Sequence, residues 1–122
     1  MMVLADTSVW IAHLRSGGGL FSSLLEEGQV ASHQFVIGEL SCGNIRNRKE
    51  ILSLIKSLPM ADIAEHDEVL DFIESHKLMG TGLGYIDMHL LASARLSGME
   101  ILTYDRRLEQ VARHMALSFK KT

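Results

Sequence analysis

The chain has 122 residues, of which 47% are hydrophobic and 22% charged, a composition typical of a globular protein rather than a disordered one. This length can bury a core without disulfides, so we expect a single domain spanning residues 1–122. The one cysteine, Cys42, cannot form an internal disulfide, which fits a reducing compartment. No basic leader precedes the N-terminal apolar stretch, and no apolar run approaches the roughly 18 residues of a membrane span. We therefore expect a cytoplasmic protein without a membrane segment.

The formal net charge of −3 argues against a nucleic-acid partner only at first sight. Six of the 15 acidic residues lie between Asp62 and Glu74, whereas basic residues cluster at 46–49, at 106–107 with Arg113, and at 120–121. Such clusters indicate either separate acidic and basic surfaces or ordinary solvated helix faces. Net charge therefore leaves a nucleic-acid partner open.

Short apolar runs alternate with longer amphipathic segments along the chain. In order, the pattern predicts a strand at 2–5, helices at 7–14 and 20–27, and a strand at 29–32 whose Ser32 caps a helix at 33–42. A helix at 49–58, a strand at 60–64 and helices at 66–78 and 85–96 follow, then a strand at 100–104, a helix at 106–114 and a strand at 116–119. This alternation predicts an α/β fold with a parallel sheet covered by helices.

Two carboxylates, Asp6 and Asp105, directly follow predicted strands. Each precedes a helix, so each has an ordinary role as a helix cap. Ligands of parallel α/β sheets bind outside the carboxyl ends of the strands, which is where both residues fall. Either role, or both, is compatible with the sequence.

Two further carboxylates, Glu39 and Asp87, fall on the apolar faces of predicted helices. An inward carboxylate costs free energy unless a cation or hydrogen bonds compensate it. The alternatives are a glutamate at the edge of its stripe that reaches water, and an aspartate that interacts with the dipole of its own helix. Four such acids together indicate a site for a hard cation such as Mg²⁺ or Mn²⁺, which prefers oxygen ligands and suits phosphodiester hydrolysis.

Other features are less specific. The segment Gly80-Thr81-Gly82-Leu83-Gly84 lacks the Gly-Lys-Ser/Thr ending of a phosphate loop, so we interpret it as a mobile lead-in to the helix of Asp87. Arg106 and Arg107 either contact an RNA backbone or are ordinary exposed residues. The six histidines show no zinc-ligand spacing.

The four acidic segments together resemble those of the PIN-domain family, most closely the VapC-type toxins of toxin–antitoxin pairs. They are Val3-Leu4-Ala5-Asp6-Thr7-Ser8, Ile37-Gly38-Glu39-Leu40, Gly84-Tyr85-Ile86-Asp87 and Ile101-Leu102-Thr103-Tyr104-Asp105. The resemblance extends over essentially the whole chain in order and spacing. It implies a three-layer α/β/α sandwich with a central parallel sheet of about four or five strands.

The resemblance also implies a function, a metal-dependent endoribonuclease that uses Mg²⁺ or Mn²⁺. Asp6, Asp87 and Asp105 would be the main ligands, Glu39 would bind metal or orient the attacking water, and Thr7, Ser8 and Thr103 would support the site. The implied partners are an RNA substrate, a cognate antitoxin whose tail enters the acidic groove, and a second copy of the chain in a homodimer. Met88 stands where many relatives carry alanine.

Two other functions remain possible. A PIN-like domain that binds RNA or protein without cutting would usually have lost one of the acids. A receiver-type signalling domain would have paired acids after the first strand and a lysine near Asp105, and this chain has neither.

Overall fold

The computed structural model describes residues 1–120, so Lys121 of the C-terminal basic pair and Thr122 lie outside the described residues. A parallel sheet of three strands lies at the centre, in the order β2-β1-β3. β1 comprises Val3–Ala5, β2 Val30–Ala31 and β3 Glu100–Leu102. Leu4 pairs with Ala31 on one side and with Ile101 on the other. The predicted α/β class is confirmed.

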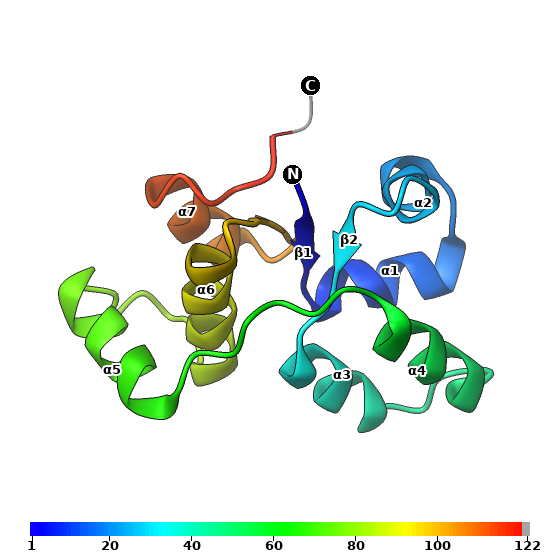
Figure 1. Cartoon of the computed structure of the whole chain (residues 1–122), viewed down its shortest axis with the longest axis horizontal. Coiled ribbons are helices and arrows are strands. Elements are labelled where there is room, and N and C mark those ends of the chain that lie inside the picture. Colours follow the sequence, from blue (N-terminus) through cyan, green and yellow to red (C-terminus); the bar gives the residue numbers. More distant parts are fainter. Residues whose placement is uncertain (121–122) are drawn as a thin grey trace.

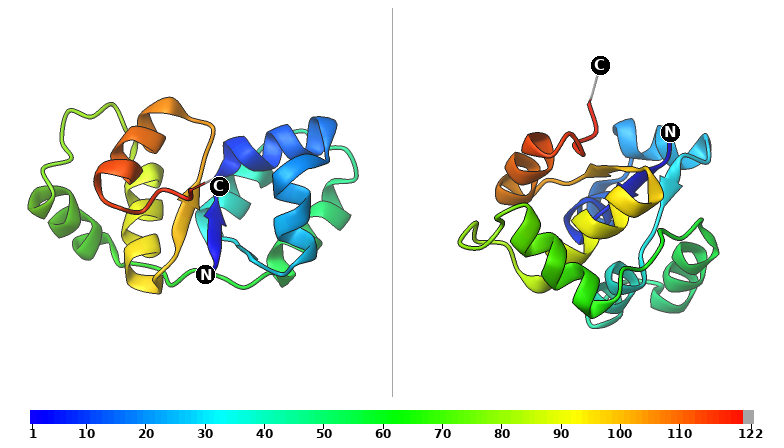
Figure 2. Two further views of the ribbon diagram at one scale, coloured as in Figure 1. Left: turned by 90° about the horizontal axis from the view of Figure 1, so that it is seen from above. Right: turned by 60° about the vertical axis from the view of Figure 1, so that its left-hand side comes forward.

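Helices cover both faces of this sheet, which gives three layers (Figures 1 and 2). α1 (Thr7–Ser16), α2 (Gly19–Glu26), α3 (Gln34–Ser41) and α4 (Arg48–Ser57) lie on one side. α5 (His66–Ser75), α6 (Tyr85–Ser97) and α7 (Arg106–His114) lie on the other. All three residues of β1 are buried because both faces of the strand are covered.

The predicted outer strands are reduced to single bridges. Ser32 pairs with Met60 and Ile101 with Ser118, both in parallel. Pro59 has no N–H to extend the first bridge, and Ala116 has a left-handed φ of 57° that ends the extended backbone before the second. The expectation of four or five strands is therefore wrong for residues 1–120, in which three strands form the sheet.

Two local expectations also need correction. Ser32 does not cap α3, because the N-cap is His33, whose side chain accepts a hydrogen bond from Phe35 N. The helix predicted over 66–78 ends at Ser75, and Lys77 adopts a left-handed φ of 53°. Within residues 1–120, no helix has the length and apolarity that crossing a membrane requires.

The parallel register determines where the acids fall. Because β1, β2 and β3 run in the same direction, their carboxyl ends meet at one edge of the sheet. Asp6 follows β1, and Thr103 and Asp105 follow β3. Asp6 N donates a hydrogen bond to Leu102 O at 3.2 Å, so the two strand ends are in contact.

Candidate active site at the carboxyl edge of the sheet

Asp6 is the buried acid of this edge, with 6% of its surface exposed. It is the N-cap of α1, and Oδ1 accepts hydrogen bonds from Val9 N at 3.3 Å and from Ser8 Oγ at 2.6 Å. Oδ2 accepts a hydrogen bond from Thr103 Oγ1 at 2.5 Å. Burial raises the pKa of the Asp6 carboxyl, these three hydrogen bonds oppose the rise, and the charge of Asp105 adds to it. The negative charge of Asp6 is thus only partly compensated by the protein.

Two hydroxyls join the ends of β1 and β3. Ser8 Oγ accepts from Tyr104 N at 3.0 Å and lies 3.4 Å from Thr103 Oγ1. Thr103 Oγ1 accepts from Asp105 N at 3.0 Å while it donates to Asp6. A hydroxyl suits both positions because it can donate and accept at once. Each of the two donates to the Asp6 carboxylate and accepts from a backbone N–H that follows β3. The loop that carries Asp105 is thereby fastened to the loop that carries Asp6.

Asp105 is exposed and caps α7, with Oδ1 accepting from Leu108 N at 3.0 Å. Asp87 is half-buried in the first turn of α6, and Oδ2 accepts from Gly84 N at 3.4 Å. The ordinary capping roles weighed for these residues therefore exist. A cap uses only part of a carboxylate's capacity as an acceptor, so it leaves lone pairs for another ligand.

Glu39 is exposed, contrary to the expectation that it points inward. The buried residues of α3 are Val36 and Leu40, one helical turn apart, and Glu39 lies at the edge of their stripe where its carboxylate reaches water. Thr7 Oγ1 donates a hydrogen bond to Glu39 Oε1 at 2.7 Å, which joins α3 to α1 beside Asp6. The buried carboxylate of this edge is that of Asp6.

The four acids interact through their charges. Burial raises the pKa of the Asp87 carboxyl, and the hydrogen bond from Gly84 opposes this. Three negative charges raise it further, those of Asp105, Asp6 and Glu39. Asp87 is therefore the residue through which four segments, far apart in the sequence, are electrostatically coupled.

The donors suit a hard cation. Every candidate ligand is a carboxylate or hydroxyl oxygen, and the only ion pair among residues 1–120 joins Arg113 to Glu109, so no lysine or arginine there neutralises the acids. Within the same residues, no three His, Cys, Asp or Glu side chains are grouped so as to hold a metal ion by themselves. Mg²⁺ usually takes one or two carboxylates and completes its shell with water and substrate phosphate, so these residues fit it.

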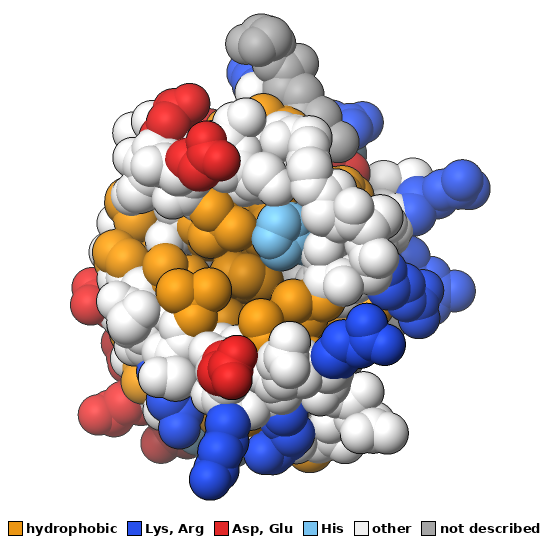
Figure 3. All heavy atoms as spheres, turned by 90° about the vertical axis from the view of Figure 1, so that its right-hand side faces the viewer, with side chains coloured by type: hydrophobic (Ala, Val, Ile, Leu, Met, Phe, Trp, Pro, Cys, Tyr) orange, Lys and Arg blue, Asp and Glu red, His pale blue; other side chains and the backbone are white. Residues whose placement is uncertain are grey.

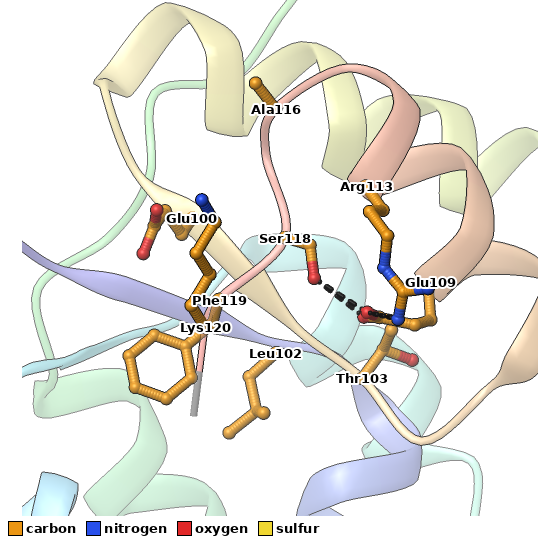
Figure 4. Close-up of a pocket in the computed structure, with 9 residues that line it drawn as sticks. All are labelled: Glu100, Leu102, Thr103, Glu109, Arg113, Ala116, Ser118, Phe119 and Lys120. Atoms are coloured by element: carbon orange, nitrogen blue, oxygen red, sulfur yellow. Dashed lines mark hydrogen bonds and ion pairs between the residues drawn. The ribbon is translucent and has the colours of Figure 1, made fainter. Parts of the chain in front are cut away.

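A cavity of about 640 Å³ lies on the other side of Thr103, between β3, α7 and the C-terminal segment (Figure 4). Of the predicted site residues, only Thr103 lines it. Glu109, a half-buried carboxylate in its lining, already has two partners, because it accepts a hydrogen bond from Ser118 Oγ at 2.8 Å and pairs with Arg113 at 2.9 Å. This cavity is thus separate from the acidic edge.

The sequence did not predict the contacts of three histidines with residues of α6, the helix that carries Asp87. His33 is fully buried and contacts Ser93 Oγ through Nε2 at 2.9 Å. The Tyr85 hydroxyl lies 2.5 Å from His66 Nδ1 and 2.9 Å from His89 Nε2. The only signal was the position of His33 next to the predicted cap Ser32.

Comparison with known proteins identifies the family to which the chain belongs. Two relatives from Mycobacterium tuberculosis, strains CDC 1551 / Oshkosh and ATCC 25618 / H37Rv, both carry the name Ribonuclease VapC32. Each is 40% identical to this chain over 109 residues, which cover 88% of the chain and 88% of the relative. Residues 3–114 match the PIN domain. The parallel sheet, the acids at its carboxyl edge and this match together show that the chain belongs to the PIN-domain family.

Proposed function

We propose that this chain, acting as a single nuclease domain over residues 1–122, is a metal-dependent endoribonuclease and the toxin of a type II toxin–antitoxin pair. The observation that carries this proposal is that four acids from distant segments meet at one edge of the sheet, where burial raises the pKa of Asp87 and the charges of Asp105, Asp6 and Glu39 add to the rise. Four acids that repel one another are costly without a cation. The relatives that are named ribonucleases support RNA as the substrate.

Each residue has a proposed role. Asp6, Asp87 and Asp105 hold the metal directly or through water, and Glu39 binds metal or orients the attacking water. Mg²⁺ or Mn²⁺, when bound, lowers the pKa of a water and stabilises the charge that develops on the phosphodiester oxygens. Ser8 and Thr103 hold the Asp6 carboxylate by their hydrogen bonds, and Thr7 holds Glu39. These three hydroxyls keep the oxygens in place before substrate arrives.

The test compares cleavage of a labelled RNA by the wild-type protein, Asp6→Asn and Asp87→Asn, with Mg²⁺ or with excess EDTA. Cleavage should require the metal and disappear in both variants, while circular dichroism shows that the fold survives. Asp71→Asn is the matched control, because Asp71 is an exposed acid on α5. Equal cleavage in EDTA would refute the mechanism, and growth arrest that persists on expression of both site variants would refute the toxin function.

One face of the molecule has the exposed apolar side chains that a protein partner such as an antitoxin could bind. Apolar side chains gather over α1, α2 and α4, with lysines and arginines along the right and lower rim and acidic side chains above and below them (Figure 3). Ile11, Leu20 and Leu54 are 41%, 42% and 53% exposed. Exposed apolar patches with a polar rim are typical of protein–protein contacts. We propose that the antitoxin covers this face.

A smaller cavity connects that face with the acids. It measures about 350 Å³ and contains Thr7 and Glu39 as well as Ile11, Arg15 and Arg46. An antitoxin tail that follows this cavity would reach the acidic edge, where an arginine would neutralise the carboxylates. We further propose a homodimer in the cytoplasm, which light scattering of the purified protein and fractionation of the cells test directly.

A further inference from the structure

Arg107 packs against the glycine loop that leads to Asp87. A methyl group built on Gly82 would lie 2.9 Å from Arg107 Nη1 and 3.1 Å from its Cδ, so an alanine at this position would displace the Arg107 side chain from its present place. Gly82 also has a φ of +85°, which side-chain-bearing residues rarely adopt. The segment expected to be a mobile lead-in is therefore in contact with α7, 25 residues further along the chain.

The contact places a cation at the acidic edge. Arg107 is the second residue of α7, directly after the cap Asp105, and Gly82 precedes the α6 cap Gly84. Gly84 N donates a hydrogen bond to Asp87 Oδ2 and Asp105 caps α7, so the loop and the first turn of α7 each adjoin one of the four acids. Arg107 is exposed, and within residues 1–120 it makes no hydrogen bond and no ion pair. The Arg107 side chain, its guanidinium group included, packs on Gly82, and its N–H donors have no hydrogen-bond partner among the described residues.

We propose that Arg107, seated on Gly82, binds a phosphate of the RNA backbone beside the four acids. This inference rests on the ribonuclease function proposed above. A guanidinium binds phosphate through two parallel hydrogen bonds, and a side chain already packed loses less conformational entropy on binding. The acids repel RNA, so a fixed cation at their border offsets that repulsion where the strand must enter. Arg106, its exposed neighbour, does not share this contact, because the three atoms nearest to a methyl group on Gly82 all belong to Arg107.

Two matched pairs of variants test the proposal. The first pair is Arg107→Ala against Arg106→Ala, which remove the same charge from adjacent positions. The second is Gly82→Ala against Gly80→Ala. Both glycines have a left-handed φ, +85° and +76°, but nothing lies within 4 Å of a methyl group built on Gly80. The second pair therefore separates displacement of Arg107 from backbone strain.

The readout is binding, measured in an Asp87→Asn background that blocks cleavage. Fluorescence anisotropy with a fluorescein-labelled, unstructured 20-nucleotide RNA gives Kd at several salt concentrations in Mg²⁺. Arg107→Ala should weaken binding about tenfold and lower the salt dependence by about one phosphate contact. Gly82→Ala should follow it, whereas Arg106→Ala and Gly80→Ala should change Kd less than about twofold.

The outcomes are distinct. If wild-type protein cuts RNA but both pairs bind alike, the role of Arg107 is overturned and the proposed function stands. If Arg107→Ala unfolds more readily while Kd and its salt dependence stay unchanged, Arg107 only packs the loop, and the proposal is again overturned. If the wild-type protein neither cuts nor binds this RNA, the proposed function fails and the inference fails with it.

Discussion

This protein should lose stability at mildly acidic pH, and replacing His33 by asparagine should make that loss smaller. His33 is fully buried, and its Nδ1 accepts a hydrogen bond from Phe35 N at 3.0 Å. A backbone N–H can only donate, so Nδ1 carries no proton, and Nε2–H donates to Ser93 Oγ. A second proton on the ring would have to sit on Nδ1 and would break the cap of α3, the helix that carries Glu39.

The magnitude follows from the pKa. Burial, and then the charge of His89, lowers the pKa of His33 from 6.5 to about 4. The unfolded chain therefore binds more protons than the folded one between these values, so stability is complete above pH 6.5 and falls as the pH drops toward 4. The full difference is about 3 kcal/mol, at 1.36 kcal/mol per pKa unit. About 2 kcal/mol of it should be lost between pH 7.5 and pH 5.

Urea denaturation of the wild-type protein and His33→Asn at pH 7.5 and pH 5 measures this term. Asparagine is a favoured N-cap and does not titrate, so the variant keeps the cap but leaves Ser93 without its partner. It should be less stable at pH 7.5, and its loss on going to pH 5 should be smaller by about 2 kcal/mol. Groups that do not interact with His33 titrate alike in both proteins and cancel in the comparison. Parallel losses in the two proteins, or an NMR titration midpoint of His33 near 6.5, would refute the reasoning.

Two further predictions concern Asp6 and the apolar face. Because burial raises the pKa of Asp6, its charged form destabilises the metal-free fold as the pH rises through that pKa, so Asp6→Asn should raise Tm in EDTA at pH 7. Mg²⁺ should raise Tm of the wild-type protein but not of this variant, and a lower Tm in EDTA would contradict the argument. Leu54→Glu, a change at a side chain 53% exposed on α4, should leave cleavage intact but weaken binding of the proposed antitoxin by tenfold or more in calorimetry. Leu70→Glu, at 43% exposure on α5, is the control, and a switch from dimer to monomer in Leu54→Glu would identify the face as a dimer contact instead.

Features that depend only on neighbouring residues could be predicted from the sequence alone. Asp6 and Asp105 cap the helices that follow them, because a carboxylate reaches an amide three residues ahead whatever the rest of the chain does. The alternation of apolar runs with amphipathic segments predicted the α/β class, and parallel strands predicted that Asp6 and Asp105 meet at one edge. The order of the four acidic segments was enough to identify the family.

Which of these residues are buried, and what they contact, depends on how distant elements pack together. Helical spacing predicted that Glu39 and Asp87 point inward, yet Glu39 is exposed, Asp87 is half-buried, and the buried acid is Asp6 at 6% exposure. Burial of Asp6 depends on its contacts with α1 and with Thr103, 97 positions away, which no local pattern encodes. The seat of Arg107 on Gly82 is equally non-local. Caps follow from bonds within one turn of chain, whereas burial and charge coupling follow from how distant elements pack, so they appear only once the sheet and its helices are assembled.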